Sequence, residues 1–158
     1  MCEEDRIAKE VVDASVKLHK HFGPGVYEPV LLHELKKRNL TTRHQIPVPL
    51  VYEGLTFDVA FKMDLVVNER VILELKSVEK LEPIHFKQLL TYLRLTGVHL
   101  GLLINFGESI LKNGIHRVVN NLLSKTFASW REISVAFKMD WRSLLGVRSL
   151  IPPSRVFA

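Results

Sequence analysis

Two stretches near the N-terminus carry apolar side chains at the spacing of an α-helix. Along residues 7–22, apolar or small residues recur every third or fourth position, with charged residues between them, which predicts an amphipathic helix. The Gly-Pro-Gly sequence at 23–25 ends this helix, because proline cannot continue it and glycine accepts positive φ. A second helix is predicted over residues 27–38, with Pro29 tolerated in its first turn.

The pattern then changes to alternation with a period of two, which predicts strands. Residues 46–50 are typical of an edge strand, because their prolines remove hydrogen-bond donors from the ladder. The remaining predicted elements are strands at 56–67 and 71–77, a helix from about Glu82 to just before Gly97, an apolar strand at 98–106, and a last helix over 115–122. This order indicates an α/β fold with a mixed central sheet flanked by helices.

Length and composition add a few limits to this picture. The chain has 158 residues, of which 47% are hydrophobic, which fits one globular domain with a core of its own. Cys2 is its one cysteine, so a disulfide framework and a cysteine-rich zinc site are excluded. We therefore expect a reducing, cytoplasmic location. The acidic N-terminus does not resemble a signal peptide, and no apolar run is long enough to span a membrane.

The net charge of +5 is unevenly distributed along the chain. Residues 111–158 carry 8 Lys and Arg against 2 Asp and Glu, whereas residues 1–110 are nearly neutral. This asymmetry indicates either a segment that contacts a polyanion such as nucleic acid, or a solvated basic tail. The hexapeptide Val-Ala-Phe-Lys-Met-Asp occurs at 59–64 and again at 135–140, and we have no physical account of the repeat.

The connection between the second and third predicted strands decides which side chains meet, because side chains alternate between the faces of a strand. A two-residue turn would pair Met63 with Glu74 and set a charge against an apolar face. A three-residue connection at 68–70 keeps apolar residues together. It pairs Val67 with Val71, Leu65 with Leu73, and Met63 with Leu75. It requires a left-handed residue, which Asn68 tolerates better than most residues.

The same register sets Asp64 across from Glu74, and Lys62 across from Lys76. Cβ atoms of cross-strand neighbours lie about 4.5–5.5 Å apart, close enough for two carboxylates to share a cation. Oxygen ligands with room for water suit Mg²⁺, which polarises phosphates and acidifies bound water. Lys76 could orient the attacking water or neutralise charge on the phosphate. The alternative is a set of ordinary surface salt bridges, which are common and individually weak.

Asp64, followed after nine residues by Glu74-Leu75-Lys76, is similar to the signature of the PD-(D/E)xK nuclease superfamily. Other motifs occur with it in order. They are Gly23-Pro24-Gly25-Val26-Tyr27-Glu28, Ile46-Pro47-Val48-Pro49, Glu74-Leu75-Lys76-Ser77-Val78, Gln88-Leu89-Leu90-Thr91-Tyr92, and Leu102-Leu103-Ile104-Asn105-Phe106 before Gly114-Ile115. Over residues 23–120 the chain therefore resembles the GxxExxY protein family, a branch of that superfamily. In this sequence Leu31 replaces the family's tyrosine, and Lys62 replaces its usual arginine.

The resemblance implies a restriction-endonuclease-like α-β-β-β-α-β core and metal-dependent cleavage of nucleic acid, with DNA favoured. Asp64 and Glu74 would ligate Mg²⁺, with Mn²⁺ as a substitute, and Lys76 would be catalytic. Glu28 would add a carboxylate to the metal site from the preceding helix. Residues 1–124 would form the nuclease-like domain, and residues 125–158 a basic C-terminal extension that is not a separate domain.

Gln88 and Tyr92 match a Q-x-x-x-Y element that some nucleases of this class place beside the active site. They lie four residues apart, hence on one helix face, with His85 one turn earlier. This polar stripe could contact phosphate or a metal-bound water. The alternative is a tyrosine whose ring is buried and whose hydroxyl bonds to the amide.

Two other classes of function stay open. One is a nucleic-acid-binding module that has kept the fold and lost turnover. The other is a protein-interaction scaffold or homodimer that uses the apolar residues near the C-terminus, which are Leu144, Leu145, Leu150 and Ile151. Neither reading involves a membrane.

Overall fold

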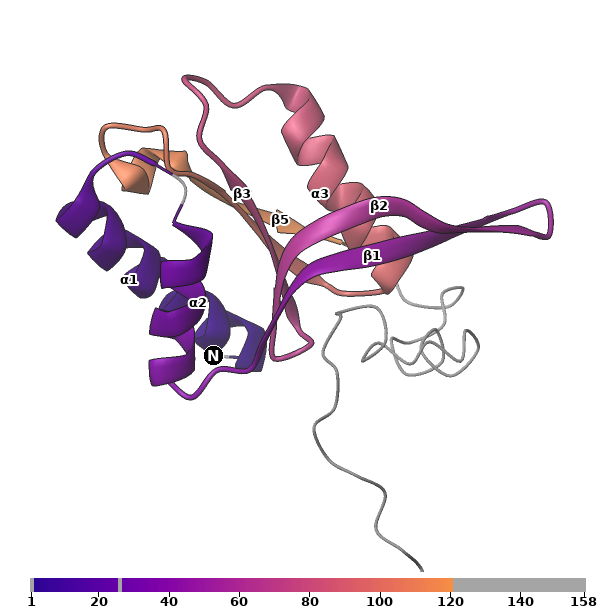
Figure 1. Ribbon diagram of the computed structural model, residues 1–158, viewed down its shortest axis with the longest axis horizontal. Coiled ribbons are helices and arrows are strands. Elements are labelled where there is room, and N and C mark those ends of the chain that lie inside the picture. Colours follow the sequence, from indigo (N-terminus) through magenta and orange to yellow (C-terminus); the bar gives the residue numbers. More distant parts are fainter. Residues whose placement is uncertain (1, 26, 121–158) are drawn as a thin grey trace, which may run out of the picture. The chain divides into compact units, whose positions relative to one another are not determined.

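The computed structural model describes residues 2–25 and 27–120, which form a mixed sheet with helices against it (Figure 1). The elements are α1 (Glu3–Phe22), α2 (Glu28–Lys37), β1 (Thr42–Tyr52), β2 (Leu55–Val67), β3 (Val71–Lys76), α3 (Pro83–Thr96), β4 (Leu100–Asn105), a 3₁₀ turn η1 (Leu111–Gly114) and β5 (Ile115–Val119). The predicted α/β class is confirmed, including an α-β-β-β-α-β succession. The sequence from 121 onward, with its predicted extension and the second copy of the hexapeptide, lies outside the described residues.

The sheet has the order β1-β2-β3-β4-β5. The ladders β1–β2, β2–β3 and β4–β5 are antiparallel, whereas β3 and β4 are parallel and are joined through α3. The proline-containing strand β1 lies at one edge, as predicted. Figure 1 shows the β1–β2 hairpin projecting beyond the other described elements, and the exposed Tyr52 and Leu55 lie at its tip.

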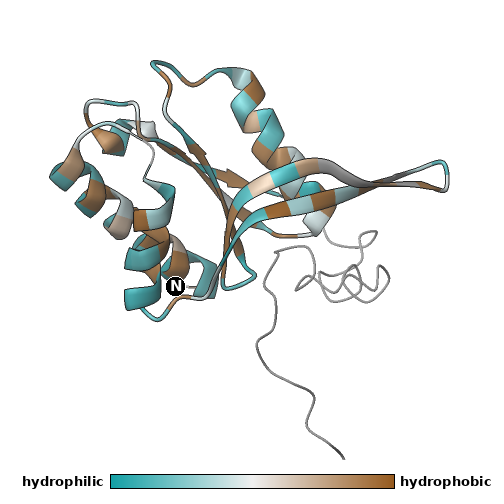
Figure 2. Cartoon of the chain, viewed as in Figure 1, coloured by the Kyte–Doolittle hydropathy of each residue, from teal (hydrophilic) through white to brown (hydrophobic). Residues whose placement is uncertain are grey.

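The two faces of the sheet are covered by different helices. On one face, α1 and α2 pack against alternate residues of the strands, including the fully buried Leu65, Leu73 and Leu100. On the other face, α3 approaches closely at Gly101, where an added Cβ would lie 2.8 Å from the Leu89 side chain. Figure 2 shows hydrophobic and hydrophilic residues alternating along the helices, as amphipathic helices between a core and solvent require.

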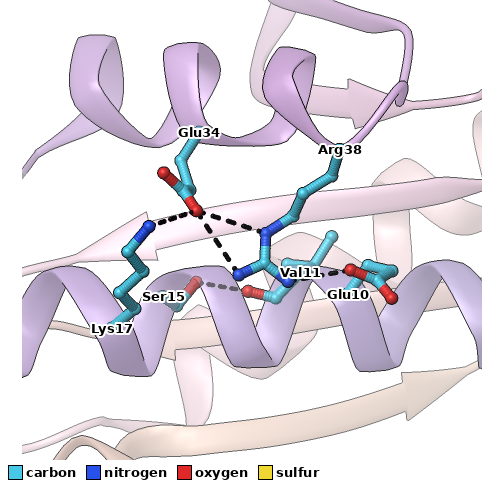
Figure 3. Close-up of polar contacts among 6 residues, drawn as sticks. All are labelled: Glu10, Val11, Ser15, Lys17, Glu34 and Arg38. Carbon is cyan, nitrogen blue, oxygen red and sulfur yellow. Dashed lines mark hydrogen bonds and ion pairs between the residues drawn. The ribbon is translucent and has the colours of Figure 1, made fainter.

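Charged side chains join α1 to α2 (Figure 3). The Lys17 ammonium donates to Glu34 Oε1 at 2.8 Å, and the Arg38 guanidinium lies 3.4 Å from the same oxygen. Arg38 also donates to Glu10 Oε2 at 2.8 Å. These four residues, which we call the interhelix cluster, hold α2 and therefore its first residue, Glu28, in place.

The predicted helix over 115–122 is wrong, because residues 115–119 form β5. Ile115 and Val119 pack against the core on the α1 side, while the His116 ring contacts Phe86 of α3, 5.2 Å between ring centroids. Residues four apart share a face in a helix and also in a strand, so spacing alone was ambiguous. Residues 115–119 form a strand because they pair with the edge of β4 along five residues. Leu122 lies outside the described residues.

No helix among residues 2–25 and 27–120 has the length and apolar character to cross a bilayer.

Candidate functional site

The β2–β3 connection has the three-residue register that the apolar pattern predicts. Val67 pairs with Val71 and Leu65 pairs with Leu73. Two residues of the connection are left-handed instead of the single one expected, Asn68 with φ 50° and Glu69 with φ 55°. The Asn68 side chain also accepts the backbone N–H of Thr41 at 2.7 Å, so it joins this connection to the start of β1.

The ladder ends at the Leu65–Leu73 pair, so Asp64 is not a ladder partner of Glu74. Asp64 Oδ2 instead accepts the backbone N–H of Leu75 at 2.8 Å. This bond fixes the carboxylate of β2 against β3 between Glu74 and Lys76. Burial raises the pKa of Glu74, and the charge of Asp64 raises it further. The structure therefore brings the two predicted acidic residues together by a side-chain-to-backbone bond rather than by a strand pair.

Glu74 lies deeper than Asp64, with only 2% of its side chain exposed. Its Oε1 accepts a hydrogen bond from the Lys76 ammonium, and its Oε2 is buried. Within the described part of the chain, Oε2 has no hydrogen-bond partner. Thr42 Oγ1 is the other such atom, and it belongs to a neutral group. A buried carboxylate oxygen without a partner is costly and calls for a physical reason.

Both acidic groups are held in surroundings that disfavour their ionised forms. Burial raises the pKa of Asp64, Glu28 raises it further, and the Leu75 N–H and Lys76 oppose the shift only in part. Burial likewise raises the pKa of Glu74, against the hydrogen bond from Lys76. A cation placed between the two carboxylates would reverse this balance, because an opposite charge favours ionisation.

Glu28, the first residue of α2, faces β1. The Gln45 amide lies 3.4 Å and 3.3 Å from its two carboxylate oxygens, and His44 Nδ1 lies 3.7 Å from Oε1. Burial is the main cause of the raised pKa of Asp64, and the negative charge of Glu28 adds to that increase. Even so, the described residues contain no group of three or more His, Cys, Asp or Glu side chains near enough to hold a metal. Asp64, Glu74 and Glu28 do not form a closed three-ligand set in this arrangement.

Gln88 and Tyr92 lie on the side of α3 that faces β2. The Gln88 amide donates to the Tyr92 hydroxyl at 2.7 Å, and that hydroxyl donates to the Lys62 carbonyl at 3.2 Å. Tyr92 is only 2% exposed, and burial, with a smaller contribution from Glu74 and Asp64, raises its pKa. The pair thus joins α3 to β2 two residues before Asp64. His85, one turn earlier, accepts the Glu82 N–H and caps the helix.

Asn105, at the end of β4, was not singled out from the sequence. Its fully buried amide accepts the Val78 N–H at 2.9 Å and donates to the Val78 carbonyl at 2.8 Å. Gly107 lies so close that an added Cβ would meet the Val78 carbonyl oxygen. These contacts fix the chain directly after Lys76. An amide that ends an otherwise apolar strand is the signal that could have found it.

Asp64 of β2 lies against β3, which carries Lys76 and the buried Glu74. A family model of the PD-(D/E)XK nuclease superfamily matches residues 5–118. The chain belongs to this superfamily. No curated protein and no solved structure matches it.

The residues present fit a divalent cation on the evidence of this structure. Glu74 Oε2 is a buried carboxylate oxygen without a partner among the described residues, and the charge of Asp64 acts on the same carboxyl group. Carboxylate oxygens are the ligands that Mg²⁺ and Mn²⁺ prefer. Two carboxylates with water completing the shell is a common arrangement for Mg²⁺, so a closed protein cage is not required.

Proposed function

We propose that this protein is a metal-dependent nuclease that hydrolyses phosphodiester bonds of nucleic acid, with DNA the favoured substrate. The observation that carries the proposal is the buried Oε2 of Glu74, which has no partner among the described residues, in the strand to which Asp64 is hydrogen-bonded. Membership of the PD-(D/E)XK nuclease superfamily supports a nucleic-acid substrate. The resemblance to the GxxExxY branch and the single cysteine, suited to a reducing cytoplasm, agree with it.

Asp64 and Glu74 would hold Mg²⁺, for which Mn²⁺ could substitute, and Glu28 would approach from α2. The bound cation would polarise a phosphate and lower the pKa of water. The cation would also stabilise the carboxylates themselves. Burial raises the pKa of both groups, so an added positive charge would favour their ionised forms.

Lys76 is the group on this chain that would act on the phosphate. Its ammonium bonds to Glu74 Oε1 and its side chain is 21% exposed, so it reaches both the buried carboxylate and the solvent side. With the charge of Glu74 compensated by a bound cation, the Lys76 ammonium would be free to donate to a phosphate oxygen. There it would neutralise the charge that builds during attack by water, as the P–O bond to the leaving group breaks.

The Gln88–Tyr92 pair would support this chemistry from α3. The Tyr92 hydroxyl is already bonded to the Lys62 carbonyl, so it fixes the strand that carries Asp64. We assign Gln88 and Tyr92 to the site on this ground, as residues that hold β2 against α3.

One observation favours a second candidate, a nucleic-acid-binding module of the same fold that has lost turnover. Within residues 2–25 and 27–120, the carboxylates do not form a three-ligand metal group. Binding of nucleic acid without cleavage, across Mg²⁺, Mn²⁺ and several substrates, would support this candidate.

The experiment that separates the two compares cleavage of single- and double-stranded DNA and RNA by wild type, Asp64→Asn and Lys76→Ala, with Mg²⁺ and with Mn²⁺. Both variants should lose at least about 100-fold in rate while keeping the wild-type circular dichroism spectrum. Asp13→Asn and Lys9→Ala, which change exposed residues of α1, are the matched controls and should cleave normally. Equal rates in wild type and Lys76→Ala would contradict the proposal.

A further inference from the structure

Gln45 has a backbone conformation that its place in the fold does not explain. Its φ is 51°, in the left-handed region that residues other than glycine rarely adopt. Other described non-glycine residues with positive φ, such as Glu53 and Asn68, lie in turns or beyond a helix end. Among them Gln45 alone lies inside a strand, β1. Such strain persists only where the surrounding structure stabilises it, and it often marks a functional site.

The strained residue lies opposite Asp64. On either side of it the β1–β2 ladder is regular, with His44 paired to Leu65 and Ile46 paired to Met63. Counting inward from both pairs sets Gln45 across from Asp64, where the ladder has no pair. A second irregularity, with a register shift, lies between Val48 and Leu50. The interruption at Gln45 therefore coincides with the aspartate of the site.

The left-handed backbone sends the Gln45 side chain to Glu28. The amide nitrogen lies within hydrogen-bonding distance of both carboxylate oxygens, at 3.4 Å and 3.3 Å. Glu28 is the first residue of α2. Gln45 thus connects a carboxylate of the helical layer to the strand position that faces the aspartate of the sheet. His44 is the neighbouring alternative, but it is half-exposed and its ring nitrogen lies farther away, at 3.7 Å.

We propose that Gln45 is a positioning residue, which holds the Glu28 carboxylate for the cation that Asp64 and Glu74 would bind. This inference rests on the proposed nuclease function, because Glu28 matters there only if a cation binds. Partners that orient ligand carboxylates typically contribute 10- to 100-fold to metal affinity or activity.

The strain makes a diagnostic substitution available. Glycine adopts positive φ without steric cost, so Gln45→Gly removes the amide and relieves the backbone together. The melting temperature of the metal-free protein should rise by about 3 °C, while Mn²⁺ affinity and cleavage rate fall by about 10-fold. A residue with a merely structural role would give changes of the same sign in stability and activity.

Glu53→Gly is the matched control. Glu53 has φ 48° in the exposed turn between β1 and β2, away from the carboxylates. Its replacement should raise the melting temperature to a similar extent and leave Mn²⁺ affinity and cleavage unchanged.

Whether Gln45 acts through Glu28 is tested by adding Glu28→Ala. The double variant Gln45→Gly/Glu28→Ala should bind Mn²⁺ and cleave as Glu28→Ala alone does, because the amide then has no carboxylate to hold. Multiplicative losses in the double variant would overturn the proposal, and so would wild-type affinity and rate in Gln45→Gly.

The two proposals fail in different ways. If wild type binds Mn²⁺ and cleaves nothing, the nuclease function fails. The Mn²⁺ affinities of wild type, Gln45→Gly, Glu28→Ala and the double variant, measured by calorimetry, then still decide the role of Gln45. If wild type cleaves and Gln45→Gly is unaffected, the positioning role alone fails. A wild type that neither cleaves nor binds metal overturns both.

Discussion

Two regions of this molecule hold a buried glutamate in opposite ways. In the interhelix cluster, Glu34 receives Lys17 and Arg38 on one oxygen, and the hydrogen bond from Lys17 is the main reason that its pKa is lowered. In the site, Glu74 receives Lys76 alone, its other oxygen has no partner among the described residues, and burial raises its pKa.

The difference separates charge that stabilises the fold from charge that the fold holds at a cost. The interhelix cluster is complete with the protein's own cations, so it needs nothing more and serves to dock α2 on α1 (Figure 3). The site is incomplete as it stands. Folds tolerate such cost where a ligand compensates it, which is the usual trade-off between stability and activity.

The largest expected difference between the regions lies in catalysis. Glu74→Gln removes a proposed ligand of the cation, so cleavage should fall about 1000-fold, in the range seen for loss of a major electrostatic group. Glu34→Gln changes the same residue type in the interhelix cluster and should leave the rate per folded molecule within about 2-fold. A rate of Glu74→Gln equal to that of Glu34→Gln would remove the distinction between the regions.

Metal should stabilise the protein through the site alone. Mn²⁺ at about 100 times its dissociation constant is expected to raise the free energy of unfolding of wild type by about 2.7 kcal/mol. Urea titrations with Mn²⁺ and with a chelator measure this. Glu34→Gln should show the same increase and Glu74→Gln none, and stabilisation of all three proteins would indicate binding elsewhere.

Without metal, the interhelix cluster should contribute more to stability. Glu34→Gln weakens charge-assisted hydrogen bonds to Lys17 and Arg38, and should lower the free energy of unfolding by about 2 kcal/mol at neutral pH. Because the pKa of Glu34 is lowered by folding, this loss should shrink as pH falls through that pKa. Equal stability of wild type and Glu34→Gln at pH 7 would contradict the reading of the cluster.

The smallest effect has the opposite sign. Glu74→Gln should raise the free energy of unfolding of the metal-free protein by about 1 kcal/mol at pH 7, because it removes a buried charge. The pKa of Glu74 is raised by folding, so its contribution is favourable below the unfolded pKa and is lost as pH rises through the folded one. The advantage of Glu74→Gln should therefore vanish at low pH, and a constant advantage across pH would contradict this cause.

Strands β1 to β4 and the β2–β3 register were predictable because apolar alternation fixes which residues can face the core. Val67 has to meet Val71 for that face to stay apolar, and it does. The error at β5 arose because Ile115 and Val119 fit both periods, and only the edge of β4 decides between them.

The contents of the site could be predicted only in part. The proximity of Asp64 and Glu74 followed from register, but the Leu75 N–H that holds Asp64 depends on where the ladder ends. Two features of the site have no recognisable pattern in the sequence. They are the oxygen of Glu74 that lacks a partner among the residues described, and the left-handed backbone of Gln45. Both result from tertiary packing, which residue patterns do not encode locally.

The central claim is that the acidic pair on β2 and β3 is completed by a divalent cation. Isothermal titration of Mn²⁺ into the metal-free wild type and into Glu74→Gln tests it most directly. The account predicts saturable binding to wild type and its loss in Glu74→Gln, with normal folding of both. Equal binding to the two proteins, or no binding to wild type, would contradict it.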